Sequence, residues 1–419
     1  MKSLYNKSNI ICKLKKVFLK IFSNETKPTK EHLIELLLSV LELKGFQSVR
    51  YNFEHSIKKF SDFQLKSYYN TLKDGKLYLK EWLLSMVEIA ISLIPKVLET
   101  QEIILSVDDT IIAKQGNCFE DCSILFDHTK PKGSPYTKGH CFVTLMLAIP
   151  IKIQKETQYI SFPLGYRMWT QKETRIKMAS DLVKLAMQVI GPERHVTVCC
   201  DSWYPKAEMV KLPDGYKNLN LICSVRSDTA LYELPAKHNG TKGRPQCRGT
   251  KISLQDFIFQ KVPQTGMSVA TKIVMTKLFG KRPVFALVTK SKSGSMRLFL
   301  STVAPEKLHF DPNCKGIEKA LSYYKKDKSY LPLTLYAFRW HIETAYYEQK
   351  KFWSLKAYML RSKRGIESLI NLLTIVYSMM PLLPLLNSEF SFLSNVSHQE
   401  ARFLLSQEIQ QEIFKYTLK

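Results

Sequence analysis

Acidic residues are scarce in this sequence of 419 residues. Asp and Glu together number 37 against 62 Lys and Arg, so the formal net charge is +25. The excess is spread along the whole chain, which predicts an extended positive surface. Such a surface favours nucleic acid as a partner, with an anionic membrane second. A lysine-rich background composition is the alternative explanation, because Lys greatly outnumbers Arg.

The sequence also lacks an uninterrupted apolar run of membrane-spanning length. Residues 369–386 come nearest, but they contain Asn371, Thr374, Ser378, Pro381 and Pro384, so we interpret them as a buried helix that ends at the prolines. The basic, amphipathic N-terminus has no clean hydrophobic signal core. We therefore expect no membrane segment.

Regular disulfide spacing is missing too, although the chain has nine cysteines. Cys199 and Cys200 are adjacent within an apolar run, which suits buried free thiols. We interpret all nine cysteines as reduced, as in a cytoplasmic or nucleoid-associated protein. The hydrophobic content of 45% and the aromatic content of 11% indicate a globular chain.

Residues 1–100 have a mostly helical pattern. Helices are expected from Lys30 onward, over residues 64–72 and over residues 77–98, the last broken at Pro95. Lysines recur throughout this region. It is either a DNA-binding module or a helical cap on the domain that follows, and both interpretations stay open.

From about residue 101, short apolar strands end in acidic residues. The run 103–107 ends in Asp108 and Asp109, and the run 195–200 ends in Asp201. If the two strands are parallel neighbours in one sheet, the carboxylates at their ends lie close together. Like charges at such a distance need a cation, and hard oxygen ligands select Mg²⁺ or Mn²⁺.

Further strands and one helix complete this part of the chain. Strands are expected over 140–150, 158–164 and 219–225, with a helix over 171–190 between the last two. Residues 226–330 hold turn clusters and alternating strands such as 269–275 and 284–288, so they predict a basic, β-rich insertion.

After the insertion, residues 336–350 contain no Gly or Pro and predict a helix. At about 100° per residue, five polar side chains fall within an arc of roughly 80°. One stripe therefore combines two phenols, a guanidinium, a carboxylate and an ammonium: Tyr336, Arg339, Glu343, Tyr347 and Lys350. The stripe is either a solvated, salt-bridged face or a site for an anionic substrate such as a phosphodiester with a metal ion.

Taken together, these residues resemble the DDE transposases, which have an RNase H-like catalytic fold. The spacing Tyr336-x2-Arg339-x3-Glu343-x6-Lys350 is similar to the YREK signature of one large bacterial insertion-sequence group. The motifs Asp108-Asp109-Thr110 and Asp201-Ser202-Trp203-Tyr204 resemble its two aspartate motifs. The resemblance covers about residues 100–385. It implies an α/β fold: an RNase H-like mixed sheet flanked by helices, with a β-rich insertion and a helical N-terminal region.

On this basis we expect five segments: a helical region over 1–100 with possible DNA binding, a first part of the catalytic core over 101–225, the insertion over 226–330, a second part of the core with the Glu helix over 331–390, and a helical C-terminal tail over 391–419. The resemblance further implies double-stranded DNA as partner, both as transposon inverted repeats and as target. Synapsis of two ends implies at least a homodimer.

The resemblance also assigns roles to residues. Asp108, Asp201 and Glu343 would be catalytic and would hold two Mg²⁺ or Mn²⁺ ions, with water and then a freed 3′-hydroxyl attacking phosphodiesters. DNA phosphates would be held by Tyr336, Arg339 and Lys350. Asp109 competes with Asp108 for the first position, and the family pattern Asp-x-Thr favours Asp108.

Two other functions stay open: an inactive or domesticated relative that only binds DNA, and a non-mobile nuclease on the same fold. Trp203 and Trp340 could stack on a displaced base, but we expect both to pack in the core. We expect His140 to be structural and Lys114 to be solvated.

Overall fold

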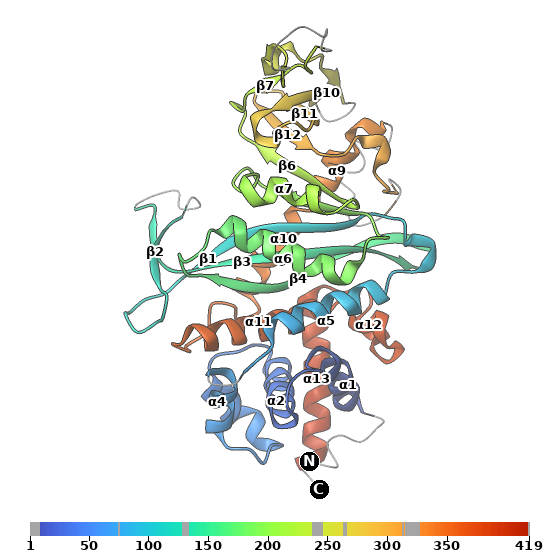
Figure 1. Ribbon diagram of the computed structural model, residues 1–419. Coiled ribbons are helices and arrows are strands. Elements are labelled where there is room, and N and C mark those ends of the chain that lie inside the picture. Colours follow the sequence, from blue (N-terminus) through green and yellow to red (C-terminus); the bar gives the residue numbers. More distant parts are fainter. Residues whose placement is uncertain are drawn as a thin grey trace.

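Strands that are far apart in the sequence meet in one mixed sheet, with helices on its faces and a helical region at one end (Figure 1). The structure is a computed structural model that describes residues 9–73, 76–127, 134–236, 246–262, 266–311, 314 and 327–417. Within these ranges the sheet contains 12 strands.

The centre of the sheet is β1 (Ile103–Ala113). It pairs antiparallel with β3 (Tyr136–Ile153) and parallel with β5 (Val196–Cys200), and β5 pairs parallel with β6 (Leu219–Val225). On its other edge β3 pairs antiparallel with β4 (Glu156–Trp169). Every residue of β5 is buried, as expected for a strand that is covered on both faces. The mixed α/β fold predicted from the sequence is therefore confirmed.

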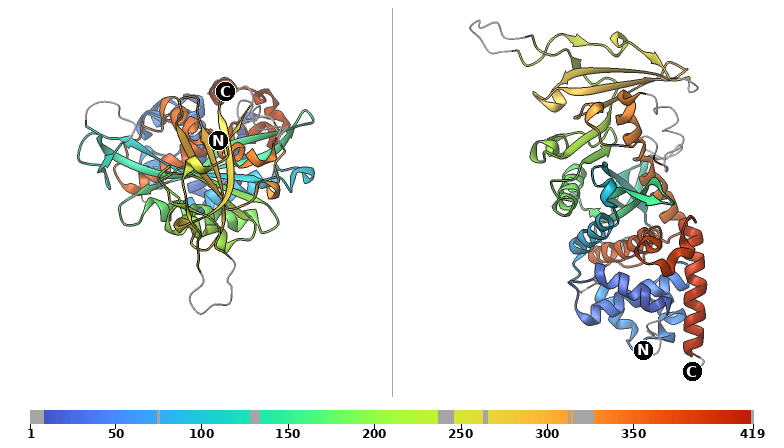
Figure 2. Two further views of the ribbon diagram at one scale, coloured as in Figure 1. Left: turned by 90° about the horizontal axis from the view of Figure 1, so that it is seen from above. Right: turned by 90° about the vertical axis from the view of Figure 1, so that its right-hand side faces the viewer.

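The predicted β-rich insertion continues the same sheet beyond β6. β12 (Met296–Ser301) pairs antiparallel with β6, followed in space by β11 (Val284–Lys290) and β10 (Ser268–Thr276). Short strands complete this end and the opposite edge: β7 (Leu231–Tyr232), β8 (Lys251–Ile252), β9 (Gln260–Lys261) and, beside β3, β2 (Ser123–Phe126). The insertion lengthens the molecule along one direction (Figure 2).

The two faces of the sheet are covered by different helices. On one face lie α6 (Arg175–Ile190), against β1 and β3, and α7 (Ala207–Gly215), against β6. On the other lie α9 (Leu331–Ala337), against β5 and β6, and α10 (Trp340–Lys351), against β1 and β4. Buried apolar side chains form two clusters, and the smaller one fills the space under α9.

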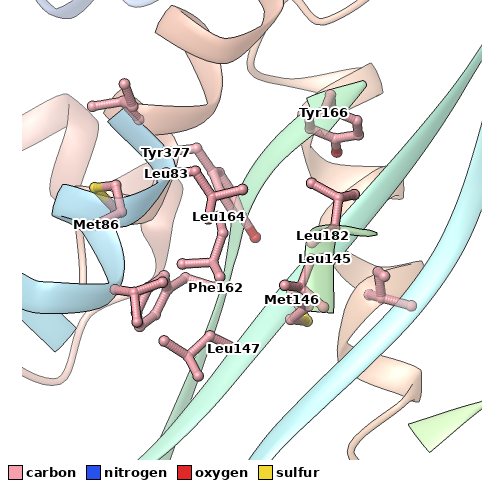
Figure 3. Close-up of a cluster of buried hydrophobic side chains, with 14 of the residues drawn as sticks. Leu83, Met86, Leu145, Met146, Leu147, Phe162, Leu164, Tyr166, Leu182 and Tyr377 are labelled. Atoms are coloured by element: carbon pink, nitrogen blue, oxygen red, sulfur yellow. The ribbon is translucent and has the colours of Figure 1, made fainter. Parts of the chain in front are cut away.

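The helical region packs below β4 and joins the two ends of the chain (Figure 1). Its helices are α1 (Ile10–Ile21), α2 (Lys27–Glu42), α3 (Val49–His55), α4 (Leu65–Lys73), α5 (Leu79–Ser92), α11 (Lys363–Met379), α12 (Leu383–Leu386) and α13 (His398–Thr417). Figure 3 shows where side chains of α5, α6 and α11 meet those of β3 and β4 in the larger cluster.

Side chains of helix α11 form hydrogen bonds with the open backbone edge of strand β4. Asn371 accepts a hydrogen bond from Tyr166 N (2.8 Å) and donates one to Tyr166 O (2.9 Å), beside the irregular pairing of β3 and β4. Glu367 accepts a bond from Met168 N at 2.7 Å. Exposed edges invite unwanted pairing, so these side chains satisfy backbone groups that would otherwise be open. The buried helix predicted to end at prolines is confirmed, because α11 ends at Met379.

No helix in the described part of the chain is long and apolar enough to cross a bilayer.

Candidate active site

The pairing register of β1 and β5 brings two predicted acids together. The last parallel pair is Val107 with Cys200, and the next residue on each strand is Asp108 or Asp201. The prediction that the first strand ends before Asp108 is wrong, because β1 continues to Ala113. Residues 108–113 find partners in β3, where Asp108 stands opposite Thr144, and this ladder outweighs the low strand propensity of Asp.

Asp109 points to the opposite face of β1, since successive side chains of a strand alternate. Its Oδ2 accepts a hydrogen bond from Arg175 Nη1 at 2.6 Å and lies 3.3 Å from Cys141 Sγ. Its Oδ1 accepts a bond from the Tyr204 hydroxyl at 2.7 Å. Both oxygens of Asp109 are therefore engaged by neighbouring side chains on the α6 side of the sheet.

Asp108 faces the helix that holds Glu343. Arg339 Nη1 lies 3.3 Å from Asp108 Oδ2, and Arg339 Nη2 lies 2.6 Å from Glu343 Oε1. One guanidinium thus bridges the strand acid and the helix acid. Glu343 occupies the first turn of α10, and Arg339 directly precedes that helix.

The prediction of a single helix over residues 336–350 is wrong, because the structure has two helices here, α9 and α10. Around the junction the backbone N–H groups of Phe338, Arg339, His341 and Ile342 donate to the carbonyl three residues earlier, so the turn is tightened. The tight turn lets the buried Phe338 ring pack on Tyr159 (5.0 Å between ring centroids) while Arg339 reaches Asp108.

The residues of the predicted stripe have different surroundings, although the Arg339 guanidinium stays 5.8 Å from the Tyr336 ring centroid. Tyr336 is buried in the cluster under α9, with its ring 4.9 Å from that of Phe299. Lys350 is half-buried, and its pKa is lowered by burial and by Lys356, against the opposing effect of Asp108 and other acids. Tyr347 is exposed and accepts a bond from Lys351 Nζ at 2.8 Å.

The surroundings of the two strand acids disfavour their charged forms. Burial, then the neighbouring Asp201 and Asp109, raise the pKa of Asp108 to about 8, and Arg339 offsets this only in part. Burial also raises the pKa of Asp201, against hydrogen bonds from the Trp203 and Tyr204 backbone and the charge of Arg339. Carboxylates in such surroundings favour a bound proton or a cation.

A divalent ion fits this set of residues by chemistry, since Asp108, Asp201 and Glu343 offer oxygen ligands only. The positions of these three side chains in the structure, however, do not form such a metal site. Among the described residues, no three His, Cys, Asp or Glu side chains are gathered closely enough to hold a metal ion. Instead, the guanidinium of Arg339 binds Asp108 and Glu343.

Two tryptophans beside the acids are exposed, so the prediction that both pack in the core is wrong. The exposed fraction is 43% for Trp203 and 58% for Trp340. Lys206 Nζ lies 4.1 Å from the Trp203 ring centroid, and the Arg175 guanidinium lies 5.1 Å from it. The Arg339 guanidinium lies 5.6 Å from the Trp340 ring centroid, so each exposed ring has a cation beside it.

The prediction that Lys114 is solvated is wrong. Its Nζ donates to the carbonyls of Lys356 and Tyr358, at 2.8 Å each, and lies 3.5 Å above the Tyr358 ring. His140 completes this group, because its ring bonds the Tyr358 hydroxyl (2.8 Å) and Glu120 O (2.9 Å). The structural role predicted for His140 agrees with these contacts, which fix the segment that follows α10.

Sequence reasoning missed Arg175 and the role of Tyr204. Tyr204 lies in the motif around Asp201, so its proximity to the acids had a signal. Arg175 is the first residue of α6, far from any motif, and only the packing of α6 on β1 brings it to Asp109.

Fold and site together define a mixed α/β protein with one aspartate within β1 and one directly after its parallel neighbour β5, side by side by register. In agreement, residues 80–277 match the family model of the DDE superfamily endonuclease. The matched span contains β1 and β5 with Asp108 and Asp201, and it ends before α10 and Glu343. No curated protein matches the chain.

Proposed function

We propose that this protein is a DNA transposase that cleaves transposon ends and transfers the strand into target DNA, in the bacterial insertion-sequence group with the YREK signature. The observation that supports it most directly is the strand register, which sets Asp108 beside Asp201, with Arg339 linking Asp108 to Glu343. The match to the DDE superfamily endonuclease supports phosphodiester cleavage of DNA as the reaction class.

In this proposal Asp108, Asp201 and Glu343 hold Mg²⁺ or Mn²⁺, two ions per site. Such ions, when bound, polarise the phosphodiester and make water a better nucleophile at neutral pH. Asp109 has a separate task, because its ties to Arg175 and Tyr204 fix the strand on which Asp108 stands.

Other residues of the stripe would position DNA. Arg339 and Lys350 are cations close to the acids and would bind phosphate oxygens. The assignment of Tyr336 to phosphate binding stays a prediction, and its burial under α9 means that the hydroxyl would have to act from within the fold. The partner is double-stranded DNA, bound by a homodimer in the synaptic complex, and the net charge of +25 suits it. The helical region over residues 1–100 is a candidate for further DNA contacts.

A cleavage assay tests the proposal. The substrate is linear DNA that contains the reading frame with its flanking sequences, incubated with Mg²⁺. We expect cleavage at the element ends by the wild-type protein and none by Asp201→Ala or Glu343→Ala. Glu193→Ala is the matched control, because Glu193 is an exposed acid before β5, at the end of that strand opposite Asp201. Unimpaired cleavage by either site variant would refute the proposal.

The products distinguish the two alternative functions. A non-mobile nuclease would cut but leave no strand joined to target DNA. A domesticated DNA-binding relative would hold the same DNA without nicking it. Two neighbouring aspartates, with Glu343 linked to one of them through Arg339, favour the enzyme, because DNA binding alone has no need of such carboxylates.

A further inference from the structure

This inference rests on the proposed function. We propose that the Arg339 guanidinium occupies the carboxylate site as an internal cation, and that a DNA phosphate must displace it before the site can bind a divalent metal ion. Metal binding would then depend on DNA binding.

The starting observation is the position of the Arg339 guanidinium. It contacts Asp108 Oδ2 at 3.3 Å and Glu343 Oε1 at 2.6 Å, and its side chain is only 9% exposed. Within the described residues, the salt bridges of Asp108 and Glu343 are both made to Arg339. A divalent ion bound by these acids would need the same oxygens.

The arrangement of the acids agrees with this competition. Asp108 and Asp201 are neighbours by register, yet no group of three acids within metal-binding distance exists among the described residues. Arg339 neutralises part of the charge that a metal would neutralise. While the guanidinium bridges Asp108 and Glu343, the site is occupied by the protein's own cation.

A phosphate is the natural competitor for the guanidinium. Arginine binds phosphate through two parallel hydrogen bonds, as it binds carboxylate. Arg339 Nε is a buried donor that has no hydrogen-bond partner among the described residues, so a new acceptor would satisfy it.

The local structure allows the side chain to be reached and moved. Arg339 lies between α9 and α10, where regular helical hydrogen bonding is already interrupted. One side of the first turn of α10 faces solvent, since the Glu343 side chain is 38% exposed and Trp340 is exposed as well. A DNA strand that follows this turn would bring phosphates to Arg339.

The consequence is a reciprocal coupling between two ligands. If DNA removes Arg339 from the acids, DNA raises the affinity for metal, and metal raises the affinity for DNA by the same factor. The protein would then assemble a complete metal site only on DNA, which limits cleavage elsewhere.

The test measures Mn²⁺ binding by electron paramagnetic resonance of the free ion, using the full chain with and without a short DNA duplex of mixed sequence. Glu343→Gln with the same duplex is the blank, because it subtracts Mn²⁺ held by DNA. We expect the duplex to raise the Mn²⁺ affinity of the wild type by about tenfold or more. Arg339→Gln should bind Mn²⁺ more tightly than the wild type without DNA and gain little from the duplex.

Arg175→Gln is the matched control. This substitution also removes one positive charge beside an acid, but that acid is Asp109, which lies on the opposite face of β1. We expect it to keep the dependence of Mn²⁺ affinity on DNA. Thermal unfolding confirms that each variant is folded. If Arg339→Gln does not fold, Arg339→Lys replaces it, since an ammonium keeps the charge but spans two carboxylates poorly, and a smaller change in the same direction is expected.

Equal Mn²⁺ affinity of the wild type with and without duplex would overturn the inference. The same holds if Arg339→Gln, or Arg339→Lys in its place, binds Mn²⁺ no more tightly than the wild type without DNA. In both cases the protein would still have a working metal site. Failure of the proposed function looks different: the wild type with duplex would then bind no more Mn²⁺ than the Glu343→Gln blank.

Discussion

Adjacent aspartates have different surroundings in this protein because a strand directs successive side chains to opposite faces. Asp108 faces α10 and contacts Arg339, whereas Asp109 faces α6 and is held by Arg175 and Tyr204. The sequence pattern left either residue as the first acid. The placement of Asp108 on the same side as Glu343 supports its assignment as the catalytic one.

This difference predicts opposite effects of two substitutions. Asp109→Asn leaves the half-buried Arg175 guanidinium without its counter-charge, so we expect the free energy of unfolding to fall by about 2 kcal/mol or more. Mn²⁺ binding with DNA should persist. Asp108→Asn should abolish Mn²⁺ binding and cost less stability, because it relieves repulsion from Asp201. Urea unfolding and Mn²⁺ titration of both variants check this, and loss of Mn²⁺ binding in a folded Asp109→Asn variant would contradict it.

Glu102 gives a pH-dependent contribution to stability. It is fully buried before β1, where Oε2 accepts a bond from the Thr197 hydroxyl (2.8 Å) and Oε1 one from His309 N (3.2 Å). Burial raises its pKa from 4.5 to about 7, and these hydrogen bonds oppose the shift. The folded protein therefore binds the proton more tightly than the unfolded chain.

It follows that stability from this group is greatest below the unfolded pKa and is lost as pH rises toward and through about 7. Glu102→Gln should remove this dependence and make the protein more stable than the wild type above pH 7, by up to about 3 kcal/mol. Chemical unfolding at a series of pH values measures it. Parallel pH profiles for variant and wild type would show that Glu102 does not titrate in this way.

At the scale of elements, α13 connects the helical region to the helix of Glu343. Glu412 accepts hydrogen bonds from Ile10 N (2.7 Å) and Ile11 N (3.1 Å) at the start of α1. Ser406 and Gln410 donate to Glu42 O at the end of α2. Arg402 donates to Phe352 O after α10 and stacks on the Trp353 ring at 4.6 Å. The predicted C-terminal tail thus includes a helix that closes the ends of three others.

We expect Arg402→Ala to lower the free energy of unfolding by about 2 kcal/mol, because it removes both the cap of α10 and the contact with Trp353. Arg226→Ala is the control: its ion pair with Asp228 is exposed, so the loss should stay below about 0.5 kcal/mol. Urea unfolding compares the two. A loss in Arg402→Ala no larger than in the control would mean that α13 does not support α10.

Local sequence signals predicted most elements but not how they meet. The run 195–200 and the helix over 171–190 were predictable because their apolar period is regular. The break at Phe338 and Arg339 was not, since no Gly or Pro marks it. The break is caused by tertiary contacts, because Phe338 packs against Tyr159 and Arg339 contacts Asp108. The exposed Trp203 and Trp340 were missed for a similar reason: only the surrounding surface decides whether a Trp is covered.

On the scale of the whole molecule, long-range pairing was the least predictable part. The antiparallel contact of β12 with β6 joins residues 298–301 to 222–225, and it extends the central sheet into the insertion. The meeting of α13 with α1 and α2, which brings the two ends of the chain together, had no local signal either (Figure 2). The proximity of Asp108 and Asp201 was predictable from parallel pairing of the two apolar runs that precede them, although β1 itself continues to Ala113.

We propose that Asp108, Asp201 and Glu343 form one metal site on DNA. Anomalous diffraction from crystals of the protein grown with a short duplex and Mn²⁺ tests it most directly. We expect manganese density bounded by these three carboxylates, with the Arg339 guanidinium on a DNA phosphate. Manganese bound elsewhere on the protein, with Arg339 still bridging Asp108 and Glu343, would contradict it.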